Sequence, residues 1–288
     1  MAQLSRTRAG MALCTLAMAV FAVQDAFTRV LVQTIAPSQI MMVRLWAFAA
    51  VMVLFAIYKG RLWQALRPAR PGLQILRAAF SAFEVVVVGF MLKYMGLAEA
   101  HALFASFPLM AALMAFAVLG ERLSAARAGA ILAGFLGALL IIKPGSGVFR
   151  PAAFLPLLAA ALFAAYQVAG RLAARHDDYL TSAVQVAVVG AVILTPFGLL
   201  AWKAANGAEW LMIAAVSIGG IGGHLLLIKA LEYAEATALQ PFNYFLLFFA
   251  TVIGVGWFGE RPDGLSVTGA LIIAASGLFS VLAGRGRA

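Results

Sequence analysis

The sequence predicts an all-α polytopic membrane protein with ten transmembrane helices in two inverted five-helix repeats. Three observations support this fold class. Hydrophobic residues make up 64% of the 288-residue chain and charged residues only 11%, with a mean hydropathy of +0.99, a balance that a soluble domain of this length does not tolerate. Apolar runs long enough to cross a bilayer recur along the whole chain. The two halves also repeat the same motifs in the same order.

Charge and cysteine usage exclude other classes. The net charge of +10 would suit nucleic acid, but the basic residues sit between apolar runs, where they set membrane topology. We therefore expect a lipid bilayer as the partner, and no nucleic acid. The single cysteine, Cys14, excludes an internal disulfide framework. The amino-terminal run resembles a signal peptide, but it is too long and carries Gln24, Asp25 and Arg29, so we interpret it as a retained first helix.

Ten spans follow along the chain, because a spanning helix needs roughly 17–25 mostly apolar residues. Short connections with polar residues, Gly or Pro separate most of them, and the longest is the basic stretch from Lys59 to Arg77. The predicted spans are 9–32, 38–58, 74–94, 97–119, 125–142, 152–173, 179–201, 209–230, 235–258 and 264–283.

The repeat is visible in matching motifs. The stretch L-K-Y-M-G-L-A-E-A-H-A-L begins at Leu92, and I-K-A-L-E-Y-A-E-A-T-A-L begins at Ile228. Each then leads through an apolar helix to Gly-Glu-Arg, at 120–122 and 259–261, and on to a small-residue helix. The repeats cover about 9–143 and 152–283, which divides the chain into units 1–143 and 144–288. Five helices per unit is an odd number, so the two units must have opposite orientations in the membrane.

Lys and Arg placement predicts the direction. Most basic residues fall on the side of the amino terminus, so both termini are expected in the cytoplasm. Trp202, Trp210 and Trp257 fall at the opposite ends of their spans, as in an aromatic belt. We expect a multi-pass protein of the inner membrane that works as a monomer.

With its repeated A-E-A segment and G-E-R turn, the chain resembles the EamA branch of the drug/metabolite transporter superfamily along essentially its whole length. Within that branch it looks most like the YddG-type exporters of amino acids. The resemblance implies alternating access. It also implies a central cavity lined mainly by the third, fourth, eighth and ninth helices, and a packing scaffold made by the fifth and tenth.

Small residues support that scaffold independently. Ala130, Gly134, Gly137, Ala274 and Gly277 recur at spacings that let helices approach closely in lipid. Gly222 and Gly223, in a glycine-rich part of the eighth helix, fit either close packing or a bend used in gating.

Intramembrane charges are costly and are therefore candidates for function. Arg44, about two turns inside the second helix, can hold a carboxylate with two hydrogen bonds. Asp25 and Glu84 can meet an ammonium group or a proton. The alternatives are structural: Asp25 pairs with Arg29 four residues on, Arg44 pairs with Asp25 or Glu84, or Glu84 is a neutral buried acid.

Two histidines and a set of aromatic residues complete the candidate site. His101 either belongs to the site or faces an outer vestibule, and His224 either belongs to it or bonds to a neighbouring helix. Neither has a partner at metal-ligand spacing, so we predict no metal and no cofactor. Pro108 and Pro241 interrupt the fourth and ninth helices at matching places, which indicates a gate or binding site. The remaining predicted substrate contacts are Phe83, Phe107, Tyr166, Gln167, Asn243 and Tyr244.

Loop charges have simpler interpretations. The symmetric pairs Lys93–Glu99 and Lys229–Glu235 and the two Glu-Arg turns are expected to be caps or salt bridges that steady one closed state. Asp177 and Asp178 are expected to be solvated loop charges.

These features favour a secondary transporter that exports small zwitterionic metabolites, such as aromatic or bulky apolar amino acids, by uniport or with protons. A drug, nucleobase or other metabolite exporter is the alternative. A passive channel suits interrupted helices less well, and a membrane enzyme lacks support because the sequence has no H-E-x-x-H, G-x-S-x-G or D-D-x-x-D motif.

Overall fold

The computed structural model describes residues 2–120, 125–142, 151–234 and 239–283, and these ranges are helical without a strand. The first half contains α1 (Ala2–Leu31), α2 (Pro37–Tyr58), α3 (Leu62–Ala65), α4 (Pro71–Tyr94), α5 (Leu97–Phe104), α6 (Phe107–Leu119) and α7 (Ala125–Ile142). The second half contains η1 (Pro151–Ala153), α8 (Phe154–Ala173), α9 (Tyr179–Leu200), α10 (Gly207–Tyr233), η2 (Gln240–Tyr244), α12 (Phe245–Phe258) and α13 (Gly264–Ala283).

The chain has the helices of a multi-pass membrane protein. Within the described ranges, 7 stretches are long and apolar enough to cross a bilayer, and three shorter apolar helices lie at Ala128–Ile142, Phe242–Phe258 and Gly264–Phe279. The shorter three coincide with the predicted fifth, ninth and tenth spans. The count of ten remains a prediction, because length and hydropathy alone select seven.

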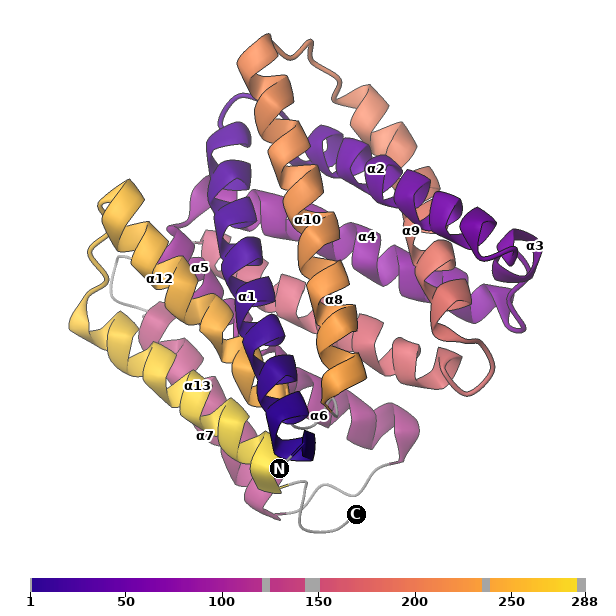
Figure 1. The fold of residues 1–288 in the computed structure, drawn as a ribbon. Helices are drawn as coiled ribbons and strands as arrows, with labels where there is room; N and C mark the ends of the chain where they lie inside the picture. Colours follow the sequence, from indigo (N-terminus) through magenta and orange to yellow (C-terminus); the bar gives the residue numbers. More distant parts are fainter. Residues whose placement is uncertain (1, 121–124, 143–150, 235–238, 284–288) are drawn as a thin grey trace.

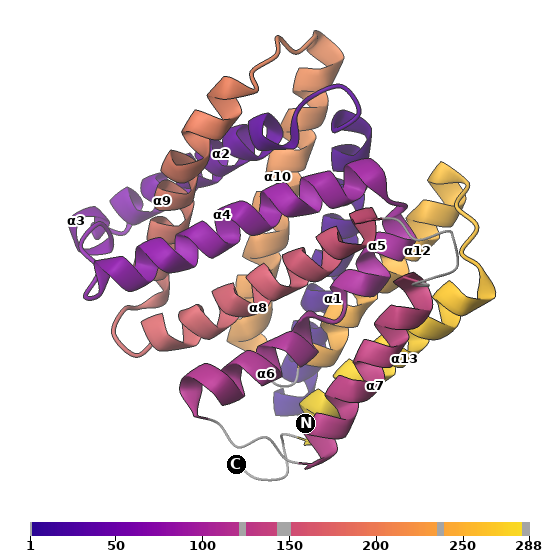
Figure 2. The same cartoon turned by 180° about the vertical axis from the view of Figure 1, so that it is seen from behind.

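The packing of the helices has the symmetry of the repeat. α1 packs on α10 as α8 packs on α4, and α1 packs on α12 as α8 packs on α6. α2 packs on α9, and α7 packs on α13, each against its own counterpart. Figures 1 and 2 show α7 and α13 side by side at one edge, with α2, α4 and α9 at the other. This pattern is the same when each helix is exchanged for its counterpart in the other half.

The predicted interruptions are present. The fourth span is broken at Ala105 and Ser106, between α5 and α6, and Pro108 stands in the first turn of α6. In the other half the 3-10 turn η2 precedes α12, so the predicted helix 235–258 is shorter than expected. Residues 235–238, which include Glu235, lie outside the described residues. Pro241 stands in the first positions of η2. In contrast, α10 runs unbroken through Gly222 and Gly223.

The glycines of α10 make room for side chains of neighbouring helices. A Cβ added at Gly223 would lie 2.4 Å from the Phe21 ring, and one added at Gly220 would lie 2.7 Å from Arg44 Nε. No side chain lies within 4 Å of the same position at Gly222. In this conformation Gly220 and Gly223 therefore serve close packing.

The α7–α13 contact depends on two facing glycines. A Cβ at Gly137 would lie 2.8 Å from the carbonyl oxygen of Gly269, and one at Gly269 would lie 2.5 Å from the carbonyl oxygen of Gly137. Backbone atoms cannot move aside as a flexible side chain can. The two helices therefore approach as closely as the predicted scaffold requires.

Gly137→Ala is expected to destabilise the protein by about 1–3 kcal/mol, the usual cost of inserting a methyl group into a packed contact. The measurement is the thermal unfolding midpoint in detergent. Gly129→Ala, on the same helix but with no neighbouring atom within 4 Å of the added Cβ, is the matched control. Equal midpoints for the two variants would contradict this packing.

Candidate functional site

A cavity of about 320 Å³ lies between the two halves. It is lined by residues of α1, α2, α4, α5, α6, α8, α9, α10, η2 and α12. Its volume is at the lower end of the range of ligand pockets, about 300–1,000 Å³. Nine of the predicted site residues are among those that line it: Asp25, Arg44, Glu84, His101, Phe107, Tyr166, Gln167, His224 and Asn243.

Arg44 projects from α2 into this cavity beside α10. The absence of a side chain at Gly220 leaves space for its guanidinium. Its nearest recorded hydrogen-bond acceptor is Met41 Sδ, at 3.7 Å. It interacts electrostatically with Asp25 and Glu84, but within the described part of the chain it forms no ion pair with either. Its planar set of donors is therefore available for a ligand.

Asp25 has a different partner from the one predicted. Its Oδ2 lies 2.9 Å from His101 Nε2, and Gln24 Nε2 donates to its Oδ1 at 3.1 Å. Arg29 instead turns toward the end of α1, where it pairs with Glu260. His101 is also 3% exposed, so the interpretation that it faces an outer vestibule is wrong: it lies in the interior of the protein, against the first helix.

Glu84 and His224 complete the polar lining. Glu84 is 8% exposed and interacts electrostatically with Arg44 and Asp25. His224 Nδ1 lies 2.8 Å from the Gly220 carbonyl oxygen, and the rings of Phe21 and Phe48 lie 5.4 and 5.5 Å from its own. Among the described residues its hydrogen bond is thus made within α10, and not to a neighbouring helix.

Aromatic rings form one wall of the cavity. The ring of Phe107 lies 5.6 Å from that of Phe104 and 5.0 Å from that of Phe163, and the ring of Phe163 lies 6.0 Å from that of Tyr166. This run leads from the α5–α6 break along α8. Such a surface suits an apolar or aromatic part of a ligand.

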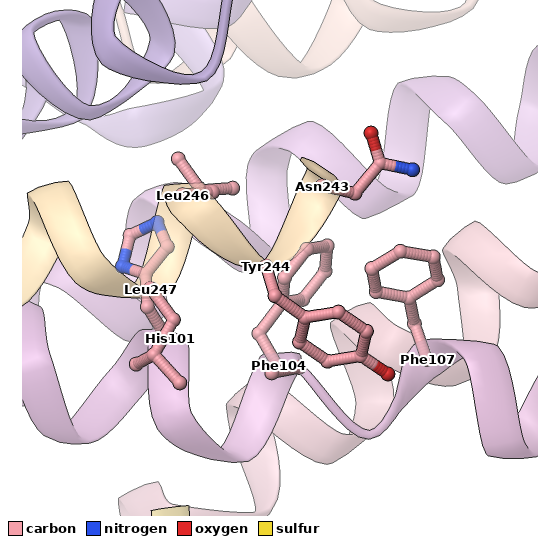
Figure 3. A pocket seen from close by; sticks show the side chains of 8 residues that line it. His101, Phe104, Phe107, Asn243, Tyr244, Leu246 and Leu247 are labelled. Atoms are coloured by element: carbon pink, nitrogen blue, oxygen red, sulfur yellow. The ribbon is translucent and has the colours of Figure 1, made fainter. Parts of the chain in front are cut away.

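Two predicted contacts lie elsewhere. Phe83 is 41% exposed and packs on Phe197 of α9, because the side of α4 that carries it faces away from the cavity. Tyr244 does not line the cavity itself but an adjoining pocket of about 10 Å³ between the α5–α6 break and η2, which shares His101, Phe104 and Phe107 with the cavity (Figure 3). Its hydroxyl lies against Gly277, where an added Cβ would come within 1.5 Å.

Arg77 is a residue that the sequence analysis missed. It lines the cavity from α4, its guanidinium carbon lies 4.7 Å above the Tyr166 ring, and its Nη2 donates to the Tyr166 hydroxyl at 3.0 Å. The sequence places Arg77 at the end of the basic stretch that begins at Lys59, because the predicted third span begins only at residue 74. Gln24, Ser81 and Ser217 also line the cavity.

At the end of α1 that leads into α2, Glu260 joins three helices. Its carboxylate pairs with Arg29 of α1 and accepts the backbone N–H groups of Leu97 and Ala98 at 2.5 and 2.9 Å, in the first turn of α5. Gly259, at φ 64°, lets the chain reverse after α12 so that Glu260 reaches these donors. Gly120 has the same conformation, at φ 68°, whereas Glu121 and Arg122 lie outside the described residues.

Other contacts on this face also join the two halves. Gln39 Nε2 donates to the Lys203 carbonyl oxygen and Gln39 Oε1 accepts from the Lys203 N–H, both at 2.8 Å. Thr34 donates to Glu209 at 2.7 Å. These bonds connect the α1–α2 loop and the first turn of α2 with the α9–α10 loop and the first turn of α10.

Asp177 and Asp178 are more than solvated charges, which corrects the prediction. Asp177 accepts from Ala69 N–H at 2.7 Å and from Gln74 Nε2 at 2.9 Å. Asp178 caps α9 by accepting the N–H of Thr181 at 2.9 Å and pairs with Arg61. Hydrogen bonds from Thr181 lower the pKa of the Asp178 carboxyl from its ordinary value. Both residues tie the α3–α4 segment to the α8–α9 loop.

The comparison with protein families decides the identity. The model of the EamA-like transporter family matches residues 8–143 and again residues 150–282. The chain belongs to the EamA-like transporter family. It is therefore a membrane transporter and not an enzyme.

Curated relatives of this EamA-like protein carry different metabolites. It is 24% identical to an S-adenosylmethionine uptake transporter of Rickettsia prowazekii, over 90% of this chain and 87% of that one. It is 31% identical to a riboflavin transporter of Brucella anthropi, over 75% and 78%. It is 28% identical to the pseudopaline exporter CntI of Pseudomonas aeruginosa, over 93% and 94%. These bacterial relatives imply the inner membrane as its location.

A solved structure supports the fold. A protein crystal structure aligns with a TM-score of 0.66 at 20% sequence identity, over 98% of this chain and 99% of that one. At this identity the likeness applies to the fold alone.

Proposed function

We propose that this EamA-family protein exports small zwitterionic metabolites, in particular amino acids with bulky apolar or aromatic side chains. The observation that carries the proposal is the set of groups around one cavity. The guanidinium of Arg44, which has no ion-pair partner among the described residues, shares this cavity with two carboxylates, Asp25 and Glu84, and with a group of aromatic rings.

The three parts of such a substrate match these groups. Arg44 binds the carboxylate with its parallel N–H donors. Glu84 or Asp25 accepts the ammonium, and the rings of Phe104, Phe107 and Phe163 receive the side chain. The cavity volume of about 320 Å³ lies within the range of pockets for small molecules, about 300–1,000 Å³.

Transport proceeds by alternating access between two inverted repeats, 1–143 and 144–288, with both termini in the cytoplasm. The contacts of Glu260 close the outer face in this conformation, which is the role expected of one Glu-Arg turn. The cavity is lined by both halves, with Arg44, Phe104 and Phe107 from the first and Phe163 from the second, so rocking the halves exposes the substrate to one side at a time.

The relatives support recognition of the amino and carboxylate groups of an amino acid, but they do not identify one substrate. S-adenosylmethionine, carried by one relative, has an α-amino and an α-carboxylate group, which are the groups that Arg44 and the carboxylates would bind. Pseudopaline export by another relative is the direction proposed for this chain.

A flat aromatic metabolite is the second candidate. The row of rings from Phe104 to Tyr166 and the riboflavin transporters among the relatives favour it. Such a substrate would use stacking on the rings and would depend little on Arg44.

Uptake into proteoliposomes separates the two. We expect saturable uptake of radiolabelled phenylalanine, methionine or threonine. An excess of the same unlabelled amino acid should inhibit this uptake, and an excess of riboflavin should not. Saturable riboflavin uptake without amino-acid uptake, in sealed vesicles that hold folded protein, would reject the amino-acid proposal in favour of the aromatic metabolite. Flux that rises linearly with concentration would indicate a pore.

A further inference from the structure

The contact between His101 and Asp25 has a consequence for protons. His101 Nδ1 lies 3.0 Å from the carbonyl oxygen of Leu97, which can only accept a hydrogen bond. Nδ1 must therefore carry a hydrogen. A neutral imidazole has one N–H, so in a neutral ring Nε2 is then a bare acceptor.

Nε2 faces a carboxylate oxygen. It lies 2.9 Å from Asp25 Oδ2, and two bare acceptors at this distance repel each other. The contact is a hydrogen bond only if a proton lies between the two atoms. Either His101 is an imidazolium beside an ionised Asp25, or Asp25 is a carboxylic acid that donates to a neutral His101. In both cases the pair holds one proton more than a neutral histidine with an ionised aspartate.

The pair is buried and lies among other polar and charged groups. His101 is 3% and Asp25 9% exposed, and Gln24 donates to the other carboxylate oxygen. Several titratable or charged groups face the pair from the helices packed around it. They are Arg44 of α2, Glu84 of α4, Tyr166 of α8, His224 of α10 and Tyr244 of η2, with Arg29 and Glu260 at the outer end of α5.

We propose that the Asp25–His101 pair is a proton-binding site and that its proton is exchanged for the substrate during transport. This rests on the proposed function, because the exchange needs a substrate with an ammonium group. When the proton leaves, Oδ2 and Nε2 are two acceptors in contact. An ammonium group that enters the cavity supplies donors to the same atoms and removes that repulsion. Proton and substrate are thus alternative occupants of one position.

The cycle is balanced in protons. One proton enters from the outer face and forms an N–H or O–H bond within the pair, and the same bond breaks when it is released to the cytoplasmic face. One substrate molecule moves outward in exchange. No other bond forms or breaks.

Transport with an imposed pH gradient tests the exchange. Proteoliposomes with an acidic interior, and with the membrane potential clamped by valinomycin and potassium, should accumulate radiolabelled phenylalanine. One proton per substrate sets a limit of about tenfold accumulation for each pH unit, since both correspond to the same factor of ten. Asp25→Asn has no carboxyl proton to exchange, so it should lose this accumulation, and whatever phenylalanine flux remains should be the same with and without the pH gradient. His176→Gln, which changes the exposed histidine of the α8–α9 loop, should behave as the wild type.

A second readout needs no substrate. The chain has 3 histidines, so ring ¹⁵N resonances of the protein in lipid can be assigned with His176→Gln and His224→Gln. We expect His101 at neutral pH either doubly protonated or protonated on Nδ1 alone with a hydrogen bond to Nε2, and we expect this signal to change in Asp25→Asn. A neutral ring protonated on Nε2 alone would overturn the proposal.

The outcomes separate the two proposals. Saturable phenylalanine flux that ignores the pH gradient would overturn proton exchange and leave the amino-acid transporter intact. Absence of flux for every amino acid would reject the proposed function, and the histidine resonances alone would then decide whether the proton site exists.

Discussion

Arg44→Ala should lower kcat/KM for phenylalanine uptake by at least about 30-fold, because removing one partner of a buried charged hydrogen bond costs about 2–5 kcal/mol. In the proposed complex Arg44 is the group that neutralises the substrate carboxylate inside the membrane. Arg44→Lys keeps the charge and loses the planar pair of donors, so we expect an intermediate loss of about tenfold. Initial uptake rates over a range of concentrations measure both.

The controls for this variant follow from the structure. Arg44 forms no ion pair within the described ranges, so its removal should leave folding intact, as size-exclusion chromatography in detergent would verify. Arg175→Ala removes an exposed charge of the α8–α9 loop and should transport normally. Uptake by Arg44→Ala within about threefold of the wild type would remove Arg44 from the binding site.

In the proposed orientation, with both termini in the cytoplasm, Glu260→Gln should open the outer face of the protein. The carboxylate accepts from Arg29 and from two backbone N–H groups of α5, and each hydrogen bond that involves a charged group contributes about 1.5–3 kcal/mol. The neutral amide loses the ion pair and part of the backbone capping. We expect the population to shift toward outward-facing conformations by about tenfold or more.

A cysteine in the cavity reports this shift. Val88 lines the cavity, and the chain has one native cysteine, Cys14, which is buried. In the Cys14→Ser, Val88→Cys background, a membrane-impermeant maleimide added outside spheroplasts should label the Glu260→Gln variant about ten times faster. Arg261→Gln, the exposed neighbouring charge, is the matched control. Equal labelling rates for Glu260→Gln and the control would mean that Glu260 does not hold the outer face closed.

The general architecture was accessible from the sequence because hydropathy and motif repetition report it directly. The apolar runs marked the helices, and the repeated Gly-Glu-Arg turn marked equivalent positions, two of which, Gly120 and Gly259, share a positive φ. Helix ends were less accurate. Helix α4, which corresponds to the predicted third span, begins at Pro71, three residues before the predicted start. Because of this difference Arg77 was not predicted as a cavity residue.

Side-chain partners were predicted less well because sequence spacing does not give helix rotation. Asp25 and Arg29 are four residues apart and could pair in an isolated helix, yet Asp25 meets His101 and Arg29 meets Glu260. Both partners are more than seventy positions away in the chain. Phe83 was misplaced for the same reason, since its neighbour Glu84 faces the cavity and Phe83 faces Phe197.

Competition with matched ligands tests the central claim, that the cavity recognises a zwitterion through Arg44. Phenylalanine, its methyl ester and phenethylamine share the ring and the amino group, and only phenylalanine has a free carboxylate. Each is offered against radiolabelled phenylalanine in proteoliposomes with the wild type and Arg44→Ala. We expect that phenylalanine alone competes in the wild type and that Arg44→Ala loses this preference. Equal competition by phenethylamine in the wild type would contradict it.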